Sequence, residues 1–307
     1  MRIVSLLPSA TEIVFALGLE DDLAAVTFEC DYPSPARDKP VVSTSSLPAS
    51  ESISAAEIDA AVGEKMARGE PLYTLDDELI RSIRPDLILA QDLCRVCAVP
   101  SGDVTEALDK LGCDAQVISL DPATIDDVIS GIEVVGRATD RIQKADALAR
   151  ELRDRVDRVR TRVDGRPRPK TLALEWADPP FVGGHWIPEM VAIAGGRDAL
   201  GAPGKPSERT TWAMVERAAP EVVAFMPCGY DLDGAVEQGA LLSQVPELAS
   251  TPAARAGRVY AVDASSFFSR PGPRIVDGLE ILAWILHPDL FPTPEPGRVA
   301  SLDKVAW

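Results

Sequence analysis

The sequence predicts an α/β fold of two similar lobes, each built around a Rossmann-like parallel sheet and joined by one long rigid helix. Short apolar runs alternate with amphipathic helical segments through the first half of the chain, a pattern typical of parallel sheets covered by helices. Residues 79–90 and 214–225 repeat one order of elements: a short helix, then Pro and an acid, then a buried strand. Between these repeats lies a long charged helix with a narrow apolar seam.

We expect an amino-terminal α/β lobe over residues 1–123, linking helices over 124–165 and a carboxy-terminal α/β lobe over 166–307. In the first lobe, the apolar runs predict strands at 3–7, 23–27, 87–90 and 115–120, and the periodic segments predict helices at 9–17, 76–83 and 103–111. Ser9 and Glu12 have the spacing of a capping box for the first helix. A polar stretch rich in Ser and Pro follows the second strand and runs to about Ser54.

The linking segment and the second lobe follow the same rules. Apolar residues at helical spacing predict helices at 125–138 and 140–163. The second lobe is predicted to contain strands at 171–175 and 258–262, the repeated unit at 214–225, and helices at 188–194, 241–248 and 273–286. A long continuous helix resists bending, so we expect only a small hinge motion between the lobes.

The charge balance excludes some partners. The chain has 31 Lys and Arg against 48 Asp and Glu, a formal net charge of −17. Nucleic acids and anionic membranes require clustered basic residues, so neither is expected as a partner. Met1 and Arg2 lead directly into the first strand, without the apolar core of a signal peptide. Together with an odd number of cysteines, this predicts a cytoplasmic location, or a periplasmic or extracellular one if a leader has been removed.

Four cysteines are predicted to follow strands. Cys30 follows the second strand, Cys94 and Cys97 follow the strand at 87–90, and Cys228 follows the matching strand of the second lobe. Ligands bind outside the carboxyl ends of strands in open α/β sheets, so we expect these thiols to face a cleft between the lobes. They could bind zinc, hold an iron–sulfur cluster, contact the metal of a ligand, or simply be buried.

Other polar and aromatic residues occupy equivalent places. His185 lies in a glycine-rich loop and is either an axial ligand for cobalt or iron or a loop histidine packed on Trp186. Aromatic rings near the strand ends would suit the flat face of a macrocycle, although aromatics are as often core residues. Arg270 precedes the last helix and could pair with ligand carboxylates or amides, or with a surface acid.

Several motifs are shared with a known family. They include Leu6-Leu7-Pro8-Ser9-Ala10-Thr11-Glu12, Glu29-Cys30-Asp31-Tyr32-Pro33, Arg84-Pro85-Asp86-Leu87-Ile88, Cys94-Arg95-Val96-Cys97, Gly184-His185-Trp186, Pro227-Cys228-Gly229 and Ser269-Arg270-Pro271-Gly272-Pro273. With the single long helix, they resemble the cobalamin-binding members of the helical-backbone substrate-binding proteins, over essentially the whole chain. That family serves ABC importers of cobalamin, haem and ferric siderophores.

The resemblance implies a non-catalytic, monomeric protein that captures a small molecule, with cobalamin or a related corrinoid as the favoured class, and that works with an ABC permease. The expected ligand-binding residues are Pro8, Ser9, Glu29, Asp31, Tyr32, Trp176, His185, Trp186, Tyr230 and Arg270. The alternative is a cytoplasmic metalloprotein or enzyme that holds zinc or an iron–sulfur cluster through Cys30, Cys94, Cys97 and Cys228. The chain shows no nucleophile elbow or phosphate loop, so hydrolase and nucleotide chemistry are unsupported.

Overall fold

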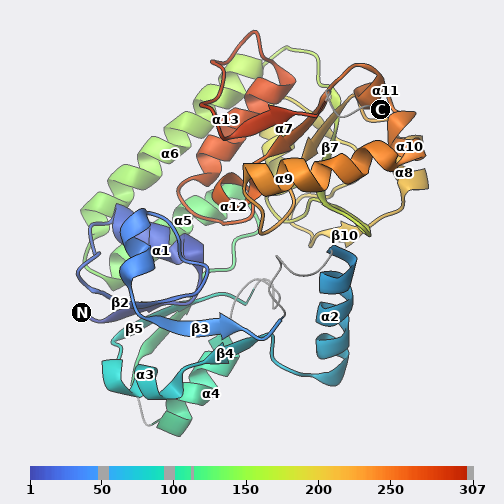
Figure 1. Ribbon diagram of the computed structural model, residues 1–307. Helices are drawn as coiled ribbons and strands as arrows, with labels where there is room; N and C mark the ends of the chain where they lie inside the picture. The colour runs from blue at the N-terminus through green and yellow to red at the C-terminus, as the bar shows by residue number, and fades with distance from the viewer. Residues whose placement is uncertain (48–54, 93–100, 112–113, 303–307) are drawn as a thin grey trace. The chain divides into compact units, whose positions relative to one another are not determined.

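The computed structural model describes residues 1–47, 55–92, 101–111 and 114–302. The chain divides into two compact units, one comprising residues 1–122 and 129–149 and the other comprising 123–128 and 150–307. Each unit contains one β-sheet (Figure 1). The predicted α/β class with two sheets is therefore confirmed.

The first sheet has the strand order β4-β3-β2-β1-β5-β6 among the described residues. Strands β3, β2, β1, β5 and β6 pair in parallel, and β4 runs antiparallel to β3 at one edge. These strands span Ile3–Ser5 (β1), Leu23–Thr27 (β2), Val41–Ser45 (β3), Tyr73–Leu75 (β4), Leu87–Ala90 (β5) and Gln116–Ser119 (β6). The central strands β1 and β5 are buried throughout, as expected of parallel strands covered on both faces.

The first unit contains α1 (Pro8–Ala16), the 3₁₀ turn η1 (Ser34–Asp38), α2 (Ala55–Arg68), α3 (Asp77–Ile83) and α4 (Ser101–Leu111). Of these, α1, α3 and α4 pack against the strands of this sheet. Side chains from the strands, such as Val4 and Ile88, pack with Ile80 of α3 and Val104 of α4 in one apolar core. Burial of such side chains is the main favourable term for folding of this unit.

Two expectations for the first unit are corrected. The capping box is wrong: α1 begins at Pro8, its N-cap Leu7 makes no side-chain cap, and Ser9 and Glu12 are buried within the helix. Proline at the first helical position loses nothing by lacking an N–H and fixes the helical φ, so it starts the helix without a polar cap. The polar stretch after β2 contains strand β3, and helix α2 follows it; neither was predicted.

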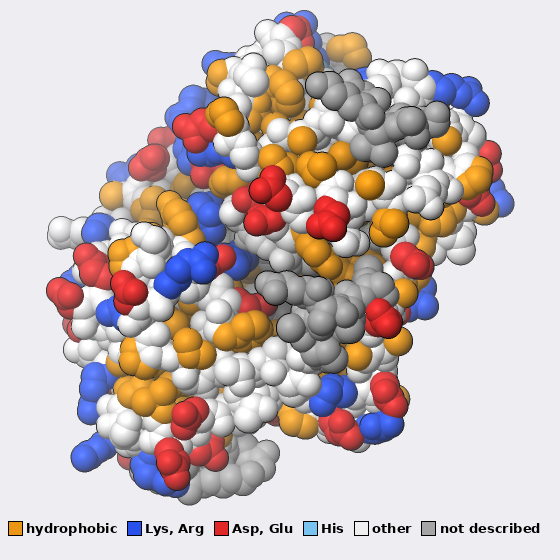
Figure 2. Space-filling view, viewed as in Figure 1, with side chains coloured by type: hydrophobic (Ala, Val, Ile, Leu, Met, Phe, Trp, Pro, Cys, Tyr) orange, Lys and Arg blue, Asp and Glu red, His pale blue; other side chains and the backbone are white. Residues whose placement is uncertain are grey.

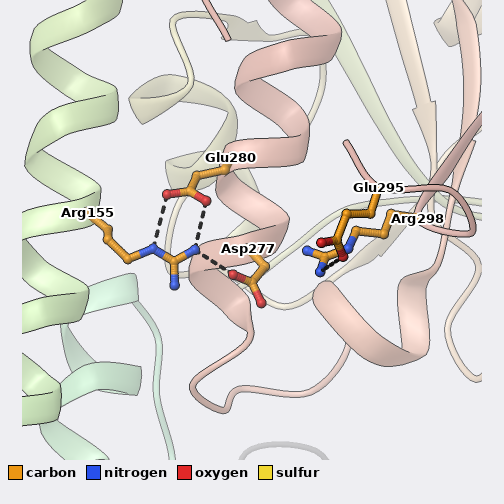
Figure 3. A network of polar contacts seen from close by, with 5 residues as sticks. All are labelled: Arg155, Asp277, Glu280, Glu295 and Arg298. Atoms are coloured by element: carbon orange, nitrogen blue, oxygen red, sulfur yellow. Dashed lines mark hydrogen bonds and ion pairs between the residues drawn. The ribbon is translucent and has the colours of Figure 1, made fainter. Parts of the chain in front are cut away.

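Helices α5 (Ile125–Ala138) and α6 (Ile142–Val163) contain the boundaries between the units. A true capping box starts α5, because the Asp127 carboxylate accepts from the Thr124 N–H at 2.9 Å and the Thr124 hydroxyl accepts from the Asp127 N–H at 3.1 Å. Within the second unit, Arg155 of α6 binds Asp277 and Glu280 of the last helix, α13 (Figure 3).

The sheet of the second unit mixes strand directions. Its order in the described chain is β10-β8-β7-β11-β12-β13, with β9 paired to β7. The strands span Lys170–Ala177 (β7), Pro180–Val182 (β8), Arg197–Asp198 (β9), Glu208–Arg209 (β10), Val222–Phe225 (β11), Val259–Val262 (β12) and Val299–Ser301 (β13). The predicted strands β7, β11 and β12 are parallel, whereas the unpredicted β8, β10 and β13 pair antiparallel to their neighbours.

Short helices surround this second sheet. They are α7 (Ile187–Ile193), α8 (Trp212–Ala218), α9 (Leu232–Gly239), the 3₁₀ turn η3 (Ala240–Gln244), α10 (Pro246–Ala249), α11 (Pro252–Arg255), α12 (Ala264–Phe267) and α13 (Ile275–Leu286). The single helix predicted at 241–248 is wrong, since Val245 is extended before Pro246 and separates η3 from α10. A residue before proline is pushed out of the helical region by the proline ring.

The repeated sequence pattern corresponds to a repeated structure. Asp76 caps α3 and Thr211 caps α8, each through a side-chain oxygen. Both helices end on a left-handed residue before proline and lead into a buried strand, β5 or β11. No helix within the described ranges combines the length and apolar character needed to cross a bilayer.

Candidate functional site

In the second unit, the carboxyl ends of β7 and β11 lie side by side. The strands pair in parallel, and beyond them the Cys228 N–H donates to the Glu175 carbonyl at 3.4 Å. This continuation brings the rings of Trp176 and Tyr230 together, with centroids 5.9 Å apart and planes inclined by 51°. Two of the predicted ligand residues, distant in sequence, therefore form one half-buried aromatic pair at a sheet edge where α/β proteins bind ligands.

Tyr230 packs on the first turn of α9. Asp231 caps this helix by accepting from the Gly234 N–H at 2.9 Å, and a Cβ at Gly234 would lie 2.8 Å from the Tyr230 ring. Burial raises the pKa of the Tyr230 hydroxyl, and the charge of Glu237 acts in the same direction. The phenol therefore stays neutral at physiological pH, in surroundings that carry negative charge.

His185 has a left-handed backbone conformation, with φ of 50°. Its N–H donates to the Lys205 carbonyl at 2.5 Å and its carbonyl accepts from the Gly204 N–H at 2.9 Å. Such a conformation is costly for a residue other than glycine and persists only where the surroundings enforce it. Burial of the half-exposed ring lowers the pKa of His185, so the imidazole is neutral at pH 7 and has a nitrogen lone pair.

The neighbour of His185, Trp186, is an interior residue. It is 6% exposed, and its indole N–H donates to the Phe268 carbonyl at 2.9 Å. The His185 and Trp186 ring centroids lie 5.7 Å apart, so the histidine contacts the tryptophan, as one of the two interpretations of the loop expects. Trp186 is thus a buried residue that supports the His185 loop, and it does not offer an exposed ring face to a ligand.

Residues 204–207 pack against the loop that carries Gly184 and His185. A Cβ at Gly184 would lie 2.1 Å from the Ser207 nitrogen, so the two backbones are in direct contact. The Ser207 hydroxyl donates a short hydrogen bond to the Glu175 carboxylate at the end of β7. This bond ties the loop to the strand that carries Trp176. Neither Ser207 nor Glu237 was predicted as a site residue, because their positions beside Glu175 and Tyr230 depend on how the chain folds.

In the first unit, the segment after β2 carries Glu29, Asp31 and Tyr32 as predicted. Tyr32 is 47% exposed, and the Asp31 carboxylate lies 3.8 Å from the Arg37 guanidinium. Pro8 and Ser9, at the start of α1, are both buried. Arg270, in the second unit, is half-buried and engaged in an interaction with its surroundings.

The four-cysteine metal site receives no support from the described residues. Cys94 and Cys97 lie outside them. Cys30 is buried, whereas Cys228 is exposed. In the ranges that the structure covers, no group of three or more His, Cys, Asp or Glu side chains could hold a metal ion. Acidic residues do mark the strand ends of the first unit, where the Asp92 N–H donates to Asp121 at 2.6 Å and the Asp92 carboxylate accepts from the Ser101 N–H at 2.8 Å.

The family model described as periplasmic binding protein matches residues 3–265. The chain belongs to this family. The resemblance to cobalamin-type members is thus confirmed, because a vitamin B12-binding relative aligns over most of this chain. A vitamin B12-binding protein of Vibrio cholerae is 24% identical over 283 residues, which cover 91% of this chain and 86% of that protein. An uncharacterised ABC transporter substrate-binding lipoprotein of Bacillus subtilis, YvrC, is 24% identical over 296 residues, covering 94% of this chain and 81% of YvrC.

Solved structures of periplasmic binding proteins share the fold. A periplasmic haem-binding protein from Pseudomonas aeruginosa superposes with a TM-score of 0.72 at 22% identity, covering 98% of this chain and 97% of that one. The periplasmic vitamin B12-binding protein BtuF of Vibrio cholerae gives a TM-score of 0.69 at 23% identity, covering 93% and 96%. These likenesses establish the architecture of this periplasmic binding protein.

The expected cytoplasmic location is wrong. The family acts outside the cytoplasm, as its description states, and one relative is a lipoprotein. The cysteine count was therefore a poor guide to compartment. Neither the comparisons nor the described side chains support zinc or an iron–sulfur cluster.

Proposed function

We propose that this chain is an extracytoplasmic substrate-binding protein that captures cobalamin or a related corrinoid and presents it, as a monomer, to an ABC permease. The observation that carries the proposal is the family match over residues 3–265, which vitamin B12-binding relatives share. The aromatic pair Trp176 and Tyr230 supports it, because two rings at strand ends suit a flat, largely apolar macrocycle.

Charge favours a corrinoid over an anionic ligand. Around the aromatic pair lie Glu175, Asp231 and Glu237, and the whole chain has a formal charge of −17. On the face shown in Figure 2, Lys and Arg side chains are scattered among Asp and Glu. A ferric catecholate or haem carries negative charge and would be repelled, whereas the rim of a corrinoid consists mostly of neutral amides.

Calorimetric titration with cyanocobalamin, dicyanocobinamide, hemin and a ferric catecholate tests the proposal. We expect a dissociation constant of about 1 μM or tighter for at least one corrinoid, equivalent to roughly −8 kcal/mol, and no heat from the catecholate. Binding of the catecholate alone, or no corrinoid binding together with iron in the purified protein, would overturn it.

One observation favours haem as a second candidate. The neutral imidazole of His185, held in a fixed backbone conformation, is a suitable ligand for iron. Absorption spectra decide between the two candidates. Haem capture predicts a shifted Soret band with hemin that His185→Asn abolishes, whereas corrinoid capture predicts cobinamide binding that survives this substitution within about threefold.

A further inference from the structure

A buried chain of hydrogen bonds links the segment after β2 to α1 and β1 in the first unit. The Thr11 hydroxyl lies 3.0 Å from the Cys30 sulfur and donates to the Ser5 hydroxyl at 2.9 Å. The Ser5 hydroxyl in turn donates to the Leu7 carbonyl at 3.0 Å. Cys30 is 4% exposed, and Ser5 and Thr11 are fully buried. The chain therefore runs through the interior from a loop thiol to the residue that precedes α1.

The direction of each bond follows from counting protons. A carbonyl only accepts, so the single hydroxyl proton of Ser5 is used on Leu7. Ser5 must then accept the proton of Thr11, which leaves Thr11 as an acceptor for its remaining neighbour. The Cys30 thiol is consequently the donor and is protonated. The buried thiol is thus engaged with Thr11, and this arrangement gives no support to the predicted metal role of Cys30.

Cys30 sits between two outward-facing aromatic residues. Phe28 is 45% exposed and Tyr32 is 47% exposed, although large apolar side chains are usually covered. The backbone is fixed on both sides of the first ring, because the Phe28 N–H donates to the Ser43 carbonyl at 3.1 Å and the Cys30 N–H donates to the Thr27 carbonyl at 3.1 Å. Within this one segment the thiol is therefore bonded in the interior while the rings on either side of it are exposed.

We propose that Cys30 is a positioning residue whose thiol, through Thr11 and Ser5, sets the segment 28–32 to receive the apolar face of a tetrapyrrole. The same chain of bonds ends at Leu7, directly before Pro8 and Ser9, so it ties together the two segments of the first unit in which ligand residues were predicted. This inference rests on the proposed function for the identity of the ligand, but the ordering of the segment is independent of it.

Matched substitutions test the inference. Cys30→Ser keeps a donor of similar size, and Cys30→Val removes the donor and adds one methyl group; Thr11→Ser and the isosteric Thr11→Val form the parallel pair. For the two Val variants we expect dicyanocobinamide affinity to fall roughly fivefold, the cost of one buried hydrogen bond. Amide hydrogen exchange in residues 28–33 should rise at the same time. The Ser variants should stay within about twofold of the wild type, and the double Val variant should cost little more than either single one.

The outcomes separate the two proposals. Equal affinity and equal exchange in wild type and Cys30→Val would overturn the positioning role, as would a Cys30→Ser variant as impaired as Cys30→Val. If the wild type binds no tetrapyrrole, the proposed function fails, and the exchange data alone decide the role of Cys30. Alkylation mapped by mass spectrometry adds a further readout. Cys228 should react roughly tenfold or more faster than Cys30, because only the former is exposed.

Discussion

Arg155 of α6 and Glu280 of α13 form a two-pronged ion pair, with Nε–Oε1 and Nη2–Oε2 distances of 3.1 and 2.7 Å (Figure 3). The same guanidinium bonds Asp277 at 2.5 Å. The hydrogen bond to Glu280 is the largest contribution that raises the pKa of Arg155 above its ordinary value, against the opposing effect of burial. One cation thus pairs with two carboxylates on the last helix, and the group of three keeps a net charge of −1.

Replacing Arg155 should destabilise the second unit. Arg155→Met keeps an unbranched apolar stem but leaves two partly buried carboxylates side by side, so we expect the free energy of unfolding to fall by about 1–2 kcal/mol. The exposed pair Arg160–Asp157 supplies the control, since its side chains are 58% and 67% exposed. Arg160→Met should change stability by less than about 0.5 kcal/mol in the same urea titration. Equal effects of the two variants would contradict the assigned role.

Removing one ring of the aromatic pair should weaken ligand binding. Trp176→Ala takes away a ring face at the strand ends, so we expect corrinoid affinity to fall by about 10- to 100-fold. Trp284, which pairs edge-on with Tyr260 at a centroid distance of 6.3 Å, serves as the matched control. Trp284→Ala should leave the dissociation constant unchanged in calorimetry, even if it lowers the melting temperature. A loss of affinity in the control alone would place the ligand elsewhere.

The protonation of His185 should make stability depend on pH. Its pKa is lowered from 6.5 in the folded protein because burial disfavours the charged ring. Below pH 6.5 the unfolded chain therefore binds a proton before the folded one does, and stability is lost as pH falls through this range. His185→Asn removes this dependence while tolerating the left-handed backbone. We expect the drop in melting temperature between pH 7.5 and 5 to be smaller in the variant; an identical drop would refute the assignment.

Two glycines should respond in opposite directions to substitution by alanine. At Gly184 a Cβ would overlap the backbone of Ser207, so Gly184→Ala should cost about 1–3 kcal/mol and displace the loop that holds His185. Gly63 lies within α2, and a Cβ there meets nothing within 4 Å. Gly63→Ala should therefore stabilise the protein by about 0.5–1 kcal/mol. Thermal and urea denaturation measure both, and destabilisation by Gly63→Ala would contradict the account of α2.

Helices and strands could be predicted where their buried apolar residues recur at a regular spacing. The helix over 125–138 and the strand over 23–27 have the observed bounds of α5 and β2, because their apolar residues recur at the spacing of one secondary structure. Helix α2 was not predicted, since most of its apolar residues are small alanines, which give only a weak hydrophobic pattern. The antiparallel strands β8, β10 and β13 were missed for a different reason. A strand of two or three residues has no period to detect, and only pairing with a neighbour defines it.

Site residues could be predicted where they directly follow a recognisable strand, because the carboxyl ends of parallel strands lie together. Trp176 and Tyr230 were placed at matching strand ends and are brought together. Side-chain direction was not predictable: Cys30 and Tyr32 lie two residues apart in one short segment, yet one is buried and the other exposed. The contact of Ser207 with Glu175 depends on the path of a loop, for which the sequence has no periodic signal.

The same junction between helix and strand occurs once in each unit. Helix α3 is capped at Arg84 with φ of 48°, and α8 is capped at Ala219 with φ of 49°; in both, proline comes next. Glycine would adopt this backbone at lower cost, yet neither position uses it. One backbone turn therefore leads into both buried strands, after which one segment continues into Gln91 and Asp92 and the other into Met226 and Pro227.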